Sequence, residues 1–214
     1  MKVPLPPSKR RSSFFVNIFI FTLLFFVLVA VILGSLNDAR KPAVYLYPVE
    51  DMNVKVKVDV NGFMYKDIPD YNNGWDVFVT KEGIIENTYD YLFYEAALFK
   101  VSLPNTGWVV EQGNLENWFK IKLTELGLNE KESRQFMEYW LSEMPVANYY
   151  EVKLLEKDFL DENMKLSISP EPDTVIRLIF YFTPMKEYKN IEEPIIVTPN
   201  REGFTVVEWG GLLD

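Results

Sequence analysis

The chain of 214 residues contains no cysteine and no histidine. These absences exclude disulfide bonds, thiol nucleophiles, zinc sites built on thiolate or imidazole ligands, and Ser-His-Asp triads. Carboxylate-based chemistry is the form of catalysis that remains plausible. We expect no cofactor and no metal. Any exported part of the chain would have to be stabilised by its hydrophobic core alone.

Charged residues are also absent from residues 14–33, FFVNIFIFTLLFFVLVAVIL. This run has the length that a helix needs to cross the hydrocarbon core of a bilayer, about 20 residues. A buried core helix would show a polar face. A cleaved signal peptide would have a shorter apolar stretch followed by a small-residue cleavage site. The pattern therefore favours an uncleaved transmembrane signal anchor.

The distribution of basic residues predicts the orientation of this anchor. Residues 9–11 are all basic, whereas residues 38–41 form a weaker basic cluster that contains an acid. Because positive flanks stay in the cytoplasm, we expect the N-terminus inside and the C-terminal domain outside the plasma membrane, with a single pass. The predicted parts are a cytoplasmic tail (1–13), a transmembrane helix (14–33), a juxtamembrane connector (34–40) and an extracytoplasmic globular domain (41–214).

Residues 41–214 are acidic, with 17 basic and 30 acidic residues and a formal net charge of −13. Such a surface repels nucleic acid and anionic lipid headgroups, and it favours cationic partners or metal ions. Acidic surfaces are most often explained by solubility alone. The charge therefore predicts that nucleic acid is not a partner, and it names no other partner.

The first half of this domain has the patterns of β-structure. Residues 53–60 alternate between valine and polar residues, and Asn61-Gly62 is a strong hairpin signal. The pattern predicts a β-meander over residues 43–86. The apolar run at 89–103 is typical of one or two central strands.

Two amphipathic helices are expected next, at residues 114–127 and 128–145. Asn114 can cap the first helix, and Asn129 with Glu132 can form a capping box on the second. Strands then return, including ones at 193–198 and 203–209. The expected fold class is α+β, a mainly antiparallel β-sheet with a two-helix hairpin packed on it, preceded by one transmembrane helix.

Three ionisable residues lie within apolar strand patterns. Alternation places Glu95 on one face with Tyr91 and Phe93, Glu208 on one face with Phe204, and Arg177 among apolar neighbours. An unpaired buried charge is costly, so Arg177 is expected to pair with Glu95, with Glu208 or with both. This candidate polar cluster is interpreted first as a buried ion network.

The alternative interpretation is catalytic. Glu95 and Glu208 could form the carboxylate pair of a hydrolase that acts on cell-surface glycans, with tyrosine and tryptophan side chains stacking on the sugars. A metal site is not favoured in DYNNGWD at residues 70–76, because Gly74 and Lys81 stand where a calcium loop requires ligands. This loop is interpreted as a turn.

Several motifs together resemble an uncharacterised family of bacteria and fungi. They are KPAVYLYP, GWDV, YLFYEA, FMEYWL, SPEPD followed by Arg177, and EWGG. Members of that family carry KPxxYLYP near the start and EWGG near the end. The resemblance covers roughly residues 41–214 and implies one intact domain. It implies no activity, ligand or cofactor, so no residue receives a role from it.

The leading functional hypothesis is a membrane-anchored extracytoplasmic domain that binds a ligand or partner, or that has an envelope-associated role. Two alternatives remain open. One is the carboxylate-based glycan hydrolase. The other is an assembly component that docks an envelope protein through an exposed sheet edge or an aromatic patch.

Overall fold

The computed structural model describes residues 18–25 and 37–214, which belong to two separate units of the chain. Residues 18–25 are helical, and the large apolar side chains of this helix are exposed. No helix within the described ranges is both long and apolar enough to cross a membrane. The predicted tail at 1–13 and most of the predicted anchor at 14–33 lie outside the described residues.

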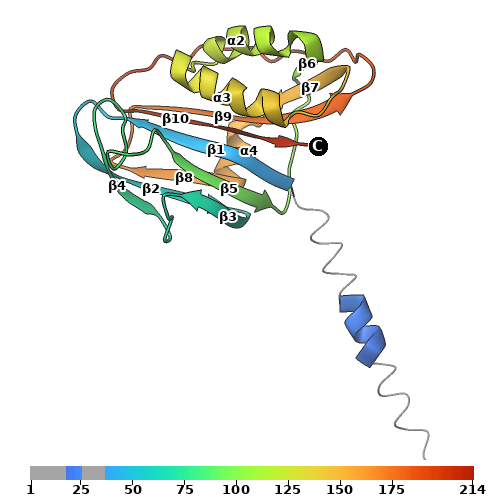
Figure 1. The fold of residues 1–214 in the computed structure, drawn as a ribbon, viewed down its shortest axis with the longest axis horizontal. Helices are drawn as coiled ribbons and strands as arrows, with labels where there is room; N and C mark the ends of the chain where they lie inside the picture. The colour runs from blue at the N-terminus through green and yellow to red at the C-terminus, as the bar shows by residue number, and fades with distance from the viewer. Residues whose placement is uncertain (1–17, 26–36) are drawn as a thin grey trace, which may run out of the picture. The chain divides into compact units, whose positions relative to one another are not determined.

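Residues 37–214 form ten strands in two sheets, shown in Figure 1. The seven-stranded sheet has the order β3 (Gly62–Ile68), β5 (Leu92–Leu98), β1 (Asn37–Tyr47), β10 (Thr205–Leu213), β9 (Thr174–Met185), β7 (Tyr149–Leu154) and β6 (Trp108–Glu111). The three-stranded sheet has the order β4 (Trp75–Val79), β2 (Met52–Val60) and β8 (Met164–Ser169). All neighbouring strands pair antiparallel except β9 and β10, which are parallel.

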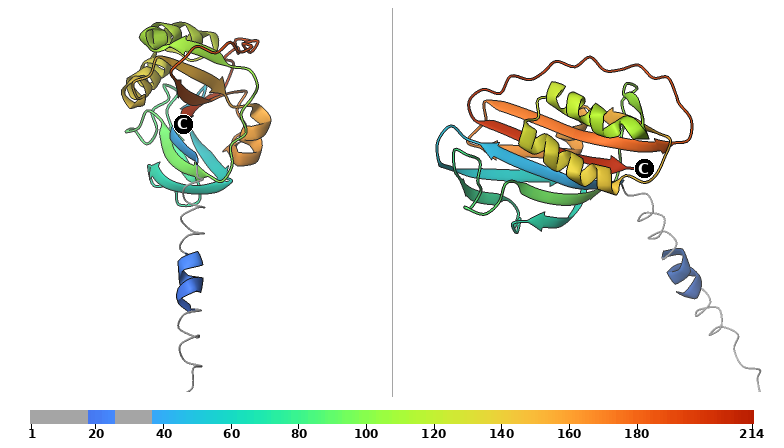
Figure 2. Two further views of the ribbon diagram at one scale, coloured as in Figure 1. Left: turned by 90° about the vertical axis from the view of Figure 1, so that its right-hand side faces the viewer. Right: turned by 45° about the horizontal axis from the view of Figure 1, so that its top comes forward.

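The helices of this domain are η1 (Gln112–Asn114), α2 (Leu115–Glu125), α3 (Glu130–Glu143) and α4 (Lys157–Asn163). The antiparallel pair α2 and α3 covers one face of the large sheet, and the small sheet covers part of the other face (Figure 2). The described domain is thus three layers thick. The predicted α+β class, the mainly antiparallel pairing and the two helices packed on the sheet are confirmed.

The large sheet separates two hydrophobic cores because side chains alternate along its strands. On β9 and β10, Ile179 and Val206 point toward the small sheet. Phe180 and Trp209 point toward the helices, where their rings lie 5.2 and 5.4 Å from the ring of Phe136. The helix side is therefore an aromatic core, and the side facing the small sheet is mainly aliphatic.

The predicted hairpin at Asn61-Gly62 is wrong. β2 lies in the small sheet and β3 in the large one, so the chain passes from one sheet to the other at this point. A Cβ atom on Gly62 would lie 1.9 Å from the carbonyl oxygen of Ala97, and glycine permits this close approach to β5. Residues 43–86 consequently do not form a single meander. Alternation identifies a strand with one covered face, but it does not identify the sheet that covers it.

Other local predictions had mixed outcomes. Asn129 and Glu132 form the expected capping box on α3. Asn114 does not cap α2, because η1 precedes the helix and Asn114 already has helical angles. The strand predicted at 193–198 is absent, and Ile195 is 95% exposed. Two prolines in and beside this segment remove backbone donors that a sheet would need. β6 and α4 had not been predicted.

Candidate functional site

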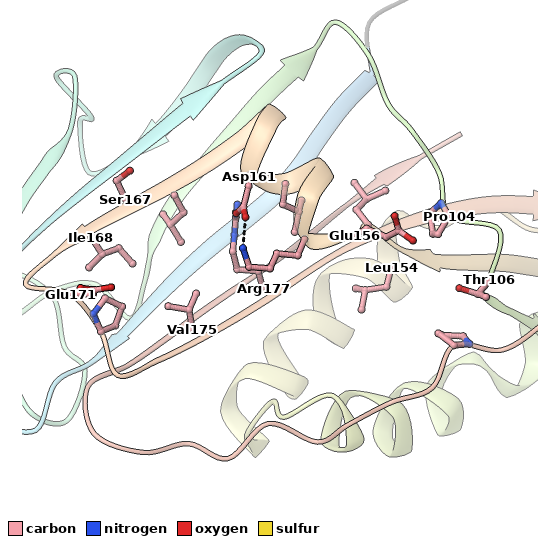
Figure 3. A pocket seen from close by; sticks show the side chains of 16 residues that line it. Pro104, Thr106, Leu154, Glu156, Asp161, Ser167, Ile168, Glu171, Val175 and Arg177 are labelled. Atoms are coloured by element: carbon pink, nitrogen blue, oxygen red, sulfur yellow. Dashed lines mark hydrogen bonds and ion pairs between the residues drawn. The ribbon is translucent and has the colours of Figure 1, made fainter.

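A cavity of about 830 Å³ lies beside β8 and α4, with β9 on its other side (Figure 3). It forms because the small sheet ends at β8, whereas the large sheet continues past β9 to β7. Part of the large sheet therefore has no strand over it. Apolar side chains form most of the walls, among them Leu154, Leu160, Leu166, Ile168 and Val175. Val175 is 49% exposed, so the cavity is open to solvent on the β9 side.

The charged group in the depth of this cavity is the guanidinium of Arg177. Its side chain is 11% exposed, and its Nε donates to Glu208 Oε2 at 2.6 Å. Glu208 is fully buried, and Tyr94 Oη donates to its other oxygen at 2.7 Å. The parallel register of β9 and β10 places Arg177 directly beside Glu208. Both carboxylate oxygens therefore have partners inside the protein.

The titration of these groups follows from the same contacts. Burial raises the pKa of the Tyr94 hydroxyl well above its ordinary value, and the charge of Glu208 raises it further. Burial alone would lower the pKa of the Arg177 guanidinium, but the negative charge of Glu208 and its hydrogen bond to Arg177 act in the opposite direction, and the pKa is raised. Arg177 is thus a permanent cation whose charge is balanced by Glu208.

Part of the guanidinium remains available to a ligand. Nη2 donates to the carbonyl oxygen of Met164 at 2.5 Å. Nη1 lies 3.9 Å from Asp161 Oδ1, an ionic contact that is too long for a hydrogen bond. Among the described residues, Nη1 has no hydrogen-bond acceptor. It can therefore donate to a carbonyl, hydroxyl or carboxylate oxygen of a molecule in the cavity.

Glu95 occupies a different place. It follows Tyr94 on β5, so it points to the helix side of the sheet, where Lys66 Nζ lies 3.3 Å from Oε2. A separate cavity of about 480 Å³ is lined there by Glu95, Lys41 and Tyr139. The structure brings Arg177 and Glu208 together and places Glu95 on the opposite face. One substrate cannot contact both carboxylates, as glycoside hydrolysis by a carboxylate pair requires.

Metal ligands do not gather in the part of the chain that the structure describes. No group of three or more acidic side chains there could hold an ion. In the segment that was compared with a calcium loop, Asn72 and Asn73 have positive φ angles of 41° and 68°, and Gly74 donates its N–H to the carbonyl of Tyr71. This geometry is that of a tight turn.

Sequence reasoning missed a second buried ion pair. Glu132 is fully buried, and Arg201 donates to both of its oxygens at 2.8 and 2.9 Å. This contact fastens the long segment after β9 to the start of α3. Glu132 was assigned to the capping box from its spacing, and nothing in the local sequence indicates its distant partner. The cavity was missed for the same reason, since it depends on where the small sheet ends.

Comparison with known proteins gives one informative match. No protein-family model matches the chain, and no solved structure matches it. A protein of Butyrivibrio fibrisolvens, named "Uncharacterized protein in bglA 3'region", is 44% identical over 65 residues. These residues are 28% of this chain and 68% of that protein.

Proposed function

Because the chain belongs to the same family as this Butyrivibrio protein, whose name records no activity, we propose a function from the cavity itself. The cavity binds a ligand, and a membrane anchor holds the domain outside the cell. The carrying observation is the cavity of about 830 Å³, with apolar walls and an available Nη1 on Arg177. Ligand sites commonly have volumes of about 300–1,000 Å³ and mostly apolar walls with few polar groups.

Binding is favoured over catalysis by the state of the charged groups. Glu208 is fully buried and neutralised by Arg177, so it is not placed to act on a substrate as a base or nucleophile. Glu95 lies on the other face of the sheet beside Lys66. A glycan hydrolase that uses Glu95 and Glu208 therefore has no support from the arrangement of these residues.

The membrane anchor is supported by the sequence of residues 14–33 and by the exposed apolar side chains of helical residues 18–25. The proposed location is the plasma membrane, with one pass and residues 41–214 outside.

The absence of cysteine allows a test of this location, because an introduced cysteine is unique. Val146 is 94% exposed. Val146→Cys should react with a membrane-impermeant maleimide on intact cells, whereas Lys2→Cys should react after permeabilisation only. Protection of Val146→Cys on intact cells would refute the orientation.

The cavity is tested by screening small-molecule fragments against the full chain in lipid nanodiscs, with methyl NMR as the readout. Fragments should shift the methyl signals of Leu160, Leu166 and Val175. Val175→Trp fills the opening and should abolish these shifts, whereas Val146→Trp, in a loop that does not line the cavity, should not. Fragment binding that clusters elsewhere, or that survives Val175→Trp, would contradict the proposed site.

A further inference from the structure

We infer that the cavity takes an extended peptide, which adds to β8 as a fourth strand of the small sheet and directs apolar side chains between the two sheets. The inference rests on the proposed function, because it names the ligand class of the same site. Strand addition of this kind requires a free strand edge, space beside it and side chains that suit the peptide.

The free edge is shown by the hydrogen bonds of the neighbouring strand β2. The N–H and the carbonyl of Val58 both bond to the hydroxyl of Tyr71, which lies on the β4 side of β2. Because consecutive residues of a strand point their backbone groups to opposite edges, the residues on either side of Val58 face β8. One of them is opposite Ser167. Ser167 therefore bonds to β2, and Leu166 and Ile168 point their N–H and carbonyl groups away from it.

The space beside this edge is the cavity. Leu166, Ser167 and Ile168 line it in succession, with Val175 and Arg177 of β9 across from them (Figure 3). A strand added to β8 would lie over the part of the large sheet that has no strand above it. Every second side chain of that strand would enter the gap between the sheets. The apolar walls predict apolar residues at those alternate positions.

The other sheet edges in residues 37–214 are less suitable for an added strand. Beside β6, the N–H of Gly107 already bonds to the carbonyl of Glu192. Beside β4, the carbonyl of Phe78 accepts the N–H of Glu86. The edge strand β3 carries charged residues, including Lys66, which discourage pairing. β8 is the edge that combines unpaired backbone groups with the large apolar cavity.

The charges around the cavity indicate which peptides fit. Glu156, Asp161 and Glu171 line it together with Lys157. Arg177 is already balanced by Glu208. The lining is therefore acidic, and it favours basic residues in the peptide. Nη1 of Arg177 can donate to a peptide carbonyl that enters the cavity.

The test uses the fluorescein-labelled peptide Lys-Val-Thr-Val-Lys-Val-Thr-Val-Lys, titrated with the full chain in lipid nanodiscs and followed by fluorescence anisotropy. Saturable binding is expected. Two control peptides carry N-methyl groups on alternate backbone nitrogens. In one peptide the methylated nitrogens are those that face β8, and in the other they are the remaining nitrogens. Methylation of the set that faces β8 should weaken binding about tenfold, because it removes several hydrogen bonds. Methylation of the other set should have little effect. Equal effects of the two sets would refute strand addition.

Two variants of one residue make the matched test on the protein. Ile168→Pro removes the N–H on the free edge of β8 and leaves the bonds to β2 in place, as proline at an edge can. Ile168→Val keeps the N–H and leaves a side chain with as many carbons as that of proline. The proline variant should bind the peptide about tenfold more weakly than the valine variant. Equal affinities of the two folded variants would overturn the inference.

The charge preference has its own control. The same peptide with glutamate in place of lysine should bind at least about tenfold more weakly at low salt, and equal binding would refute the preference for basic peptides. If no peptide binds up to about 1 mM while fragments occupy the cavity, strand addition is wrong and the proposed function stands. If neither peptides nor fragments bind there, both fail.

Discussion

Replacing Glu208 by glutamine would remove the negative charge that faces Arg177 inside the protein, while keeping the shape of the side chain. Glu208 is fully buried and the Arg177 side chain is 11% exposed, so water compensates this change poorly. Removal of one partner from a buried ion pair typically costs about 3–5 kcal/mol. Arg177 keeps its bond to the carbonyl of Met164 and a contact with Asp161, which eases the loss. We expect the free energy of unfolding to fall by about 3 kcal/mol.

Thermal unfolding monitored by circular dichroism measures this loss. For a domain of this size, 1 kcal/mol corresponds to about 2–4 °C, so the Tm of Glu208→Gln should fall by about 6–12 °C. Glu95→Gln is the matched control, because Glu95 pairs with Lys66, whose side chain is 53% exposed. Such a pair contributes about 0–1 kcal/mol. A Glu208→Gln variant that loses no more stability than Glu95→Gln would refute the structural role of this ion pair.

A double substitution separates the contribution of the ion pair to stability from the contribution of Glu208 alone. Arg177→Met on its own leaves the charge of Glu208 buried, and Glu208→Gln on its own leaves the charge of Arg177 poorly compensated. The double variant leaves neither charge. It should therefore be more stable than the sum of the two single losses predicts, by about 2 kcal/mol. Additive losses would show that the two side chains are not coupled.

Three further predictions concern other parts of the fold. Burial raises the pKa of Tyr45 and Tyr94 above 10, so the unfolded chain releases these protons at a lower pH than the folded chain does. Urea denaturation should therefore show stability falling above about pH 10, by up to about 1.4 kcal/mol per pH unit for each residue. A flat profile would contradict this. Glu132→Ala removes both the N-cap partner and the partner of Arg201, so it should lower the free energy of unfolding by about 3 kcal/mol or more. A loss below about 1 kcal/mol would mean that the cap acts alone. Gly62→Ala places a methyl group against Ala97 of β5 and should reduce the Tm by several degrees, and an unchanged Tm would show that β3 can shift away from β5.

Local alternation was sufficient to place each ionisable side chain on a face of its own strand. Glu208 lies on one face with Val206, and Arg177 lies on one face with Ile179, as the pattern predicted. Alternation cannot say which faces of two distant strands coincide. Arg177 meets Glu208 because β9 and β10 are parallel neighbours in register, whereas Glu95 points to the opposite side of the sheet.

The cavity depends on how distant strands are distributed between the two sheets. The alternation in residues 53–60 correctly indicated a strand with one covered face, but β2 pairs with β4 and β8, and not with β3. The cavity exists because this small sheet stops at β8. No local pattern in residues 164–169 reports that the strand has one neighbour. The fold class and the candidate members of the ion pair were therefore accessible from the sequence, whereas the cavity was not.

Hydrogen exchange at three consecutive amides of β8 tests the central claim most directly. In the free protein, the amides of Leu166 and Ile168 should exchange fast and that of Ser167 slowly, because Ser167 alone of the three bonds to β2. Saturating peptide should slow exchange at Leu166 and Ile168 and leave Ser167 unchanged. Fast exchange at Leu166 and Ile168 that persists with bound peptide, or new protection at another sheet edge, would contradict a binding site beside β8.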